Sequence, residues 1–234
     1  MNHHFSGIEL FYAENYREGD THITLSGSEY LHLIRVMRHS PGDEIHFTDG
    51  KGNFILSKFI RNGKNEGEFE IISRTFHPDK AGNLTFFIPI LRNPDRMEFA
   101  LEKAVELGIT NFVFFKADKS VKQNLNLKRL ESIALAAMKQ SIRFHKPHIS
   151  FADKLTEKLC EGKMTALLDQ DAVTSVTSMT EISREVCFIF GPEGGLSERE
   201  SGLFRGSLKL NLSDHRLRAE TAVVTTASVI SQML

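Results

Sequence analysis

Five residues with the sequence GPEGG, at 191–195, comprise three glycines, a proline and one glutamate. Glycine reaches positive φ and lets a ligand approach the main chain closely, whereas proline stiffens a turn. Just beyond, Ser197 and Glu200 have the spacing of a capping box, which satisfies the first amides of a helix from within the chain. A helix start that is already capped, and that follows the acid Glu193, is a poor cradle for phosphate. The segment predicts a turn that holds an uncharged or cationic ligand by its backbone; the alternative is a tight connection without a ligand.

Two further polar segments follow apolar runs. LDQD lies at 168–171, and SDHRLRAET at 213–221 precedes an apolar, alanine-rich stretch. In open parallel sheets the ligand site lies beyond the carboxyl ends of the strands, so we expect these segments and GPEGG to lie near one another. Two interpretations of the last segment stay open: Arg218 and Glu220 pair or cap the terminal helix, or they face a substrate. In either case they need partners, because an unpaired buried charge is costly.

Several other kinds of site are disfavoured. The patterns GxGxxG, GxxxxGK(S/T) and GxSxG are absent, so nothing points to a dinucleotide fold, a P-loop or a nucleophile elbow. The histidine pairs His3/His4 and His145/His148 lack cysteine or carboxylate partners at ligand spacing. We therefore expect no metal site.

From residue 76 onward, continuous apolar runs alternate with amphipathic segments. Asn93 and Pro94 form a good helix cap and first turn, and Gly108 a stop. Strand, helix and strand in this order indicate parallel crossovers, and the apolar runs indicate a sheet buried on both faces. The predicted strands are 84–90, 111–117, 164–169, 185–190 and 208–212, and the predicted helices are 93–108, 127–142, 152–161 and 219–234.

Residues 1–75 have a different pattern of residue types. Short runs of β-branched and aromatic residues alternate with the turn signals PGD, DG and NG, which is typical of a small antiparallel barrel or sandwich. One helix is expected near 28–39, because Tyr30, Leu33, Ile34 and Met37 fall on one face. The sequence thus predicts two domains, an all-β module at 1–75 and an α/β domain at 76–234.

The composition is that of an ordinary globular chain: 234 residues, 41% hydrophobic and 25% charged, with a net charge of −1. No stretch is long and apolar enough for a membrane helix, and the start lacks a signal-peptide pattern, so we expect a cytoplasmic protein with no membrane partner. Cys160 and Cys187 lack a CxxC spacing and are expected to be reduced core or edge residues.

A basic band interrupts this neutral composition. Between 116 and 148, eight basic residues stand against two acidic ones, Asp118 and Glu131. The band is either a solvated helix face or a footprint for a polyanion. Its basic members are Lys116, Lys119, Lys122, Lys128, Arg129, Lys139, Arg143 and Lys146.

The segments GPEGGLSERE and LRAETA together resemble the ribosomal RNA small subunit methyltransferase E family, within the SPOUT class. The likeness spans nearly the whole chain: EYLHLIRVMRHSPGDEIHFTDGKG is similar to the PUA-like barrel of that family, and KQSIRFHKPHI to its central basic motif. The resemblance implies an α/β fold with a SPOUT-type trefoil-knotted, mostly parallel sheet and an N-terminal PUA-like β-barrel. It also implies S-adenosylmethionine-dependent methylation of N3 of one uridine in 16S rRNA of the 30S subunit, by a homodimer without metal.

The same resemblance implies roles for individual residues. Arg218 would stabilise the uracil anion, and Glu220 would position Arg218 or take the proton. The implied RNA-binding residues are Arg35, Arg38, Gln140 and Arg143. The implied S-adenosylmethionine-binding residues are Leu168, Gly191, Pro192, Glu193, Gly194, Leu210, Leu212, Ser213 and Leu217.

The chain departs from the family pattern inside the basic motif. Lys139 stands where the family usually has glutamate, and Ile142 replaces a small residue before Arg143. In the segment 213–221, Ser213 takes the position of a customary glycine, His215 that of an arginine and Ala219 that of a threonine. Two alternatives remain: a SPOUT methyltransferase that acts on another RNA position, such as a ribose hydroxyl, and a non-catalytic RNA-binding adaptor.

Overall fold

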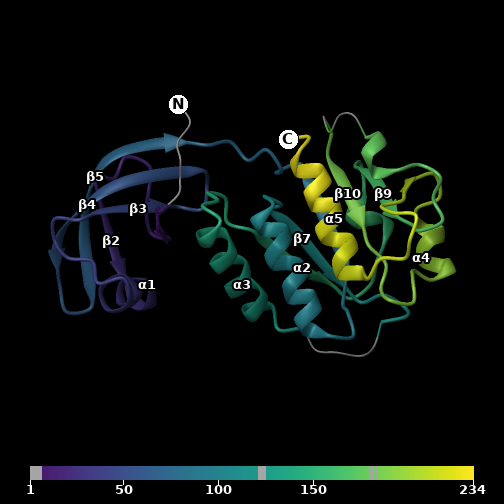
Figure 1. Cartoon of the computed structure of the whole chain (residues 1–234), viewed down its shortest axis with the longest axis horizontal. Helices are drawn as coiled ribbons and strands as arrows, with labels where there is room; N and C mark the ends of the chain where they lie inside the picture. Colours follow the sequence, from purple (N-terminus) through teal and green to yellow (C-terminus); the bar gives the residue numbers. More distant parts are fainter. Residues whose placement is uncertain (1–6, 121–124, 180–181, 183) are drawn as a thin grey trace. The chain divides into compact units, whose positions relative to one another are not determined.

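The computed structural model describes residues 7–120, 125–179, 182 and 184–234. Contacts within the chain divide it into two units (Figure 1). We call Met1–Asp79 with Met138–Lys146 the β unit, and Lys80–Ala137 with Pro147–Leu234 the α/β unit.

The β unit contains one five-stranded sheet, which confirms the predicted all-β module. Its strand order is β1-β3-β4-β5-β2, with β1 parallel to β3 and the other pairs antiparallel. The long β4–β5 pair carries two register shifts, and such bulges bend a strand pair and let the sheet curl around buried Phe47, Phe59 and Phe69. The strands are β1 (Leu10–Tyr12), β2 (His22–Ser26), β3 (Glu44–Thr48), β4 (Asn53–Asn62) and β5 (Glu66–Phe76).

The helix expected near 28–39 is present in two parts, α1 (Gly27–Leu31) and the π-helix η1 (His32–Val36). Tyr30 and Leu33 are fully buried, as predicted. Met37 is 42% exposed, so the prediction that it lies on the same helix face as Tyr30 and Leu33 was wrong. The Met37 N–H donates to the His32 carbonyl five residues earlier, and this wider turn rotates the following side chain off a face predicted for 3.6 residues per turn.

The α/β unit has a six-stranded sheet in the order β11-β9-β10-β6-β7-β8, and every neighbouring pair is parallel. This confirms the predicted parallel α/β architecture. Within this unit helices α2 and α5 pack side by side (Figure 1). The strands are β6 (Leu84–Pro89), β7 (Asn111–Phe115), β8 (His148–Ala152), β9 (Met164–Leu168), β10 (Val186–Ile189) and β11 (Leu208–Leu210). The helices are α2 (Pro94–Glu106), α3 (Leu127–Gln140), α4 (Glu198–Leu203) and α5 (Ala219–Ser231), with short 3₁₀ turns η2 (Glu157–Cys160) and η3 (Val176–Ser178).

The helix predicted at 152–161 was wrong. Residues up to Ala152 belong to strand β8, and only the single 3₁₀ turn η2 follows. β8 pairs with β7 along its whole length, from Asn111 opposite His148 to Phe115 opposite Ala152. This pairing is a long-range contact, which local periodicity does not record.

Both cysteines are buried and free, as predicted, and lie in one apolar cluster with Phe87, Phe115 and Ile189. Within the described residues, no helix is long and apolar enough to cross a membrane. The same part of the chain holds no group of three or more His, Cys, Asp or Glu side chains that could bind a metal.

Candidate functional site

The carboxyl ends of β9, β10 and β11 lie at one edge of the sheet. Leu210 of β11 is in register with Leu168 of β9, and Ile189 of β10 with Leu167. Beyond that edge the Asp169 N–H donates to the Leu210 carbonyl at 2.9 Å. The segments that follow these strands therefore meet, as expected for a parallel sheet.

The glycine-rich turn, residues 191–196, closes on itself after β10. The Gly195 N–H donates to the Pro192 carbonyl at 2.8 Å, and Gly195 has a φ of 69° that other residues rarely adopt. A Cβ at Gly191 would lie 3.4 Å from the Gly195 Cα and from the Leu196 nitrogen. Glycine at 191 thus permits the close approach of the turn's two ends, and glycine at 195 permits its backbone conformation.

Glu193, at the tip of this turn, is held by two other loops. The Arg92 N–H, after β6, donates to Glu193 Oε1 at 3.3 Å. The Arg216 guanidinium, after β11, donates to the Glu193 carbonyl at 3.0 Å. The turn is therefore connected to segments more than twenty residues away in the sequence.

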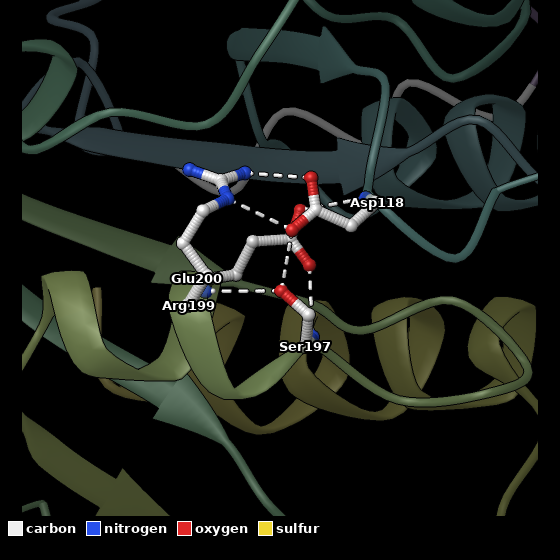
Figure 2. Close-up of polar contacts among 4 residues, drawn as sticks. All are labelled: Asp118, Ser197, Arg199 and Glu200. Carbon is white, nitrogen blue, oxygen red and sulfur yellow. Dashed lines mark hydrogen bonds and ion pairs between the residues drawn. The ribbon is translucent and has the colours of Figure 1, made fainter.

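Four polar residues fix the start of α4 (Figure 2). The Ser197 hydroxyl accepts from the Glu200 N–H, and Glu200 Oε2 accepts from the Ser197 N–H, which confirms the predicted capping box. Glu200 is fully buried, and its Oε1 accepts from the Asp118 N–H at 2.9 Å. The Asp118 carboxylate accepts two hydrogen bonds from Arg199, at 2.7 and 2.9 Å. The Arg199 guanidinium and the Ser197 hydroxyl lower the pKa of Asp118 to about 2.

Leucine main-chain groups beyond β11 differ in their availability. The Leu210 carbonyl accepts from Asp169. Leu212 and Leu217 are half-buried, and among the described residues no hydrogen bond uses the main-chain N–H or C=O of either. Between them, the Ser213 hydroxyl accepts from the His215 N–H at 3.1 Å. Leu212 and Leu217 therefore offer unused backbone donors and acceptors in the segment that follows β11.

Arg218 and Glu220 do not pair with each other. Glu220 is only 8% exposed, and its carboxylate lies 3.5 Å from the Arg96 Nε of helix α2. Arg218 occupies the N-cap position of α5 and is exposed, and its guanidinium has no hydrogen bond or ion pair to any other described residue. Sequence reasoning missed Arg96, although the burial expected of Glu220 required such a partner.

The four predicted RNA-binding residues lie in the β unit, whereas every predicted catalytic and cofactor-binding residue lies in the α/β unit. All four are exposed: Arg35, Arg38, Gln140 and Arg143. Arg38 has a left-handed backbone, with a φ of 61°.

The basic motif joins the β unit through its main chain. The Phe144 carbonyl accepts from the Thr48 hydroxyl at 3.1 Å and from the Gly52 N–H at 2.9 Å, and the Lys146 N–H donates to Gly50. Lys139, which departs from the family pattern, pairs with Glu29. No local pattern indicates this attachment, because it joins residues more than ninety positions apart.

Four of the eight basic residues of the band form separate ion pairs. Lys122 lies outside the described residues, as do His3 and His4. The band is divided between the two units, so it is not one continuous helix face. Its ion pairs are Lys116–Asp153, Arg129–Glu98, Lys139–Glu29 and Lys146–Glu14.

A shallow depression of about 830 Å³ lies elsewhere, beside the edge strand β11. It is lined by 163–165, 171–174 and 206–209, and contains no residue of the glycine-rich turn. Because ligands of parallel sheets bind beyond the carboxyl ends of the strands, we do not assign the function to this depression.

Comparison with known families gives two matches. Residues 78–231 match the RNA methyltransferase domain model, and residues 25–72 match the RNA methyltransferase PUA domain model. The first match covers more than half of the chain and contains all the predicted catalytic and cofactor-binding residues.

Individual relatives extend over nearly the whole chain. A ribosomal RNA small subunit methyltransferase E from Aquifex aeolicus is 28% identical over 95% of this chain and 99% of its own. A probable rRNA-methyltransferase from Porphyromonas gingivalis has a TM-score of 0.84 at 26% identity, covering 97% of this chain and 98% of its own. The fold is also shared with a ribosomal RNA small subunit methyltransferase E from Neisseria gonorrhoeae solved with S-adenosyl methionine, at a TM-score of 0.82, 24% identity and coverage of 96% and 97%.

Proposed function

Because the chain belongs to the ribosomal RNA small subunit methyltransferase E family, we propose that it transfers the methyl group of S-adenosylmethionine to N3 of one uridine in 16S rRNA. Membership of this family supports the reaction class, which is methyl transfer to RNA. The base atom, the uridine and the roles of single residues belong to the proposal. The expected trefoil knot likewise stays a prediction.

The observation that carries the proposal is the meeting of three segments at one sheet edge. The turn after β10 is joined to the segment after β11 by Arg216, and the segment after β9 is joined to β11 by Asp169. A ligand at this edge would contact main-chain groups from all three segments. This arrangement suits a nucleoside-bearing molecule that is bound chiefly by backbone groups.

The described residues fit S-adenosylmethionine better than a phosphate-bearing cofactor. The amides at the start of α4 are already used by the capping box, so no anion cradle is free there. Leu212 and Leu217 retain main-chain groups that can bind an adenine edge, whereas the Leu210 carbonyl is engaged. We propose that these leucines, with Leu168, Gly191, Pro192, Glu193, Gly194 and Ser213, form the cofactor site.

When bound, S-adenosylmethionine supplies a methyl group on a positively charged sulfur. The chain must hold the uracil N3 in line with that methyl group, and alignment of this kind contributes about 7–11 kcal/mol to catalysis. Arg218 is the proposed donor to the uracil O2 or O4 as the N3 proton passes to solvent water, because its guanidinium is exposed and has no partner among the described residues.

Glu220 has a narrower role in this proposal than the resemblance implies. Its carboxylate is buried and lies 3.5 Å from the Arg96 Nε, and no hydrogen bond or ion pair joins it to Arg218 among the described residues. We propose that the Arg96–Glu220 pair fixes the first turn of α5, at whose N-cap Arg218 stands. In this proposal the start of α5 positions Arg218, and no direct bond between Glu220 and Arg218 is needed.

The β unit is proposed to hold the RNA. Arg35, Arg38, Gln140 and Arg143 present exposed polar groups to phosphates, which give affinity that depends on salt but not on sequence. A homodimer is also proposed. Helix α5 already packs against α2 with Ala227 buried, so only its remaining small residues, such as Ala219, Ala222 and Ser228, are available to a second copy.

The test is methylation of 30S particles from a strain that lacks the endogenous enzyme, followed by mass mapping of the 16S rRNA. We expect one methylated uridine, modified at N3. Arg218→Ala should lower the turnover number by roughly 100-fold, which is the usual loss for one donor to a developing anion, with unchanged affinity for S-adenosylmethionine. Arg205→Ala is the matched control, because Arg205 is an exposed arginine beyond α4 and outside the three segments.

Each alternative has its own signature in the same assay. Methylation of a ribose hydroxyl, or of another base, would replace the proposed target. Uptake of RNA without uptake of S-adenosylmethionine in a calorimeter would support the non-catalytic adaptor. Full turnover by Arg218→Ala would remove Arg218 from the mechanism.

A further inference from the structure

Lys119 lies on the glycine-rich turn although it belongs to another loop. Its ammonium donates to the Gly194 carbonyl at 3.1 Å and to the Leu196 carbonyl at 3.2 Å. The side chain also covers Gly194, since a Cβ there would lie 3.6 Å from the Lys119 Cδ. One exposed lysine therefore bonds two peptide oxygens of the turn, on either side of Gly195, where the backbone turns left-handed.

The loop that carries Lys119 is itself fixed. Its neighbour Asp118 is bonded through its main chain to the buried Glu200 and through its side chain to Arg199 (Figure 2). On the other side, the Ser120 hydroxyl donates to the Ile90 carbonyl at 3.0 Å. Lys119 thus has an anchored residue on each side, so its ammonium has a defined position relative to the turn.

The strand order shows from which side Lys119 approaches. β10, which leads into the turn, lies between β9 and β6, and β7 follows β6. The loop with Lys119 leaves β7, whereas the other segments of the proposed cofactor site leave β9 and β11. Lys119 therefore reaches the turn from the side opposite to those segments.

We infer that Lys119 is a positioning residue for the cofactor: by bonding the outer peptide oxygens of the turn, it fixes the main-chain groups that the turn presents toward β9 and β11. The inference rests on the proposed function and deepens it. Asp118, Arg199 and Glu200 support Lys119 by holding its loop. None of these four residues needs to touch the cofactor.

The test compares Lys119→Met with the wild-type chain by calorimetry, using S-adenosylmethionine and, separately, the uncharged product S-adenosylhomocysteine. We expect the Kd of both ligands to rise by roughly fivefold, because an exposed charge-assisted contact contributes less than a buried one. In methylation assays the KM for S-adenosylmethionine should rise by a similar factor while kcat stays within about twofold. Lys119→Arg, which retains the charge and the donors, should restore most of the affinity.

Lys116→Met is the matched control, because Lys116 lies in the same loop and pairs instead with Asp153. It should leave both Kd values unchanged. The melting temperature of the ligand-free Lys119→Met chain should stay within about 2 °C of the wild type, which separates positioning from a loss of stability.

Three results would overturn the inference. Unchanged affinity in Lys119→Met would show that the turn holds its shape without the lysine. A gain in affinity for S-adenosylmethionine alone would show that the lysine acts by repelling the sulfonium. A matched loss in Lys116→Met would show a general effect of loop charge. Wild-type chain that binds neither ligand would instead refute the proposed function, and the two failures are therefore distinguishable.

Discussion

Helices α2 and α3 end in the same hydrogen-bond pattern but with different residues at its critical position. In both, two main-chain amides beyond the helix return to carbonyls of its last turn, as in a Schellman motif. The residue that must turn left-handed is Gly108 after α2, with a φ of 97°, and Ile142 after α3, with a φ of 54°. The bonds are Gly108 to Val105 and Ile109 to Ala104 after α2, and Ile142 to Lys139 and Arg143 to Met138 after α3.

The difference separates a relaxed helix end from a strained one. Left-handed backbone costs a residue with a Cβ about 1–2 kcal/mol, and β-branched side chains are the least suited to it. Among the described residues, all positive-φ positions of the α/β unit are glycines. Two described residues other than glycine have a positive φ, Arg38 and Ile142, and both lie in the β unit. One is a proposed RNA-binding residue and the other precedes Arg143, which agrees with the tendency of backbone strain to collect at functional sites.

The largest effect is expected at the relaxed end. Gly108→Ala should lower the free energy of unfolding by about 1–2 kcal/mol, because alanine is strained at this φ. Urea unfolding of the two chains measures the loss. An unchanged urea midpoint would mean that the end of α2 does not need glycine at position 108. The contrast between the ends of α2 and α3 would then not hold.

A smaller effect is expected at the strained end. Ile142→Gly and Ile142→Ala both remove every side-chain contact beyond Cβ, so their difference reports chiefly the backbone conformation. The glycine variant should be more stable than the alanine variant by about 1 kcal/mol. Ala136→Gly, at an exposed position inside α3, is the control and should show the reverse order by a similar amount. Equal stability of the two Ile142 variants would argue against strain.

The smallest effect concerns the bridge between the two helices. Glu98 of α2 pairs with Arg129 of α3, and the Arg129 hydrogen bonds lower the pKa of the Glu98 carboxyl. Since the folded-state pKa lies below the unfolded value, the pair stabilises the fold above about pH 4.3 and this contribution is lost as the pH falls through the folded-state pKa. Glu98→Gln should therefore lose less than about 1 kcal/mol at pH 7 and approach the wild type in acid. Stability curves against pH for both chains test this, and a constant difference down to pH 3 would contradict it.

Local patterns predicted most elements of the fold. Asn93 and Pro94 begin α2, and the Asn93 side chain accepts from the Asp95 N–H as a helix cap should. The capping box of Ser197 and Glu200 was equally visible, because its two partners are three residues apart. Strand β8 was missed, since its hydrogen bonds depend entirely on β7.

The candidate site was predicted in part for the same reason. The glycine-rich turn was recognisable from residue type and spacing, whereas the role of Arg218 stays a prediction. Lys119, Asp118 and Arg199 were not recognisable in this way, because their contacts join loops about eighty residues apart. The rule that sites follow strand ends would have directed attention to Asp118 and Lys119, which follow β7.

By itself, the sequence determined what lies within a few residues: helix caps and stops, strand periodicity, the turn that needs glycine, and the family. Only the tertiary structure decided the order β11-β9-β10-β6-β7-β8, the partner of Glu220 and the attachment of residues 138–146 to the β unit. The physical reason is range. Backbone conformation and capping are set by neighbouring atoms, whereas strand order and ion pairs between loops are set by which apolar surfaces pack together.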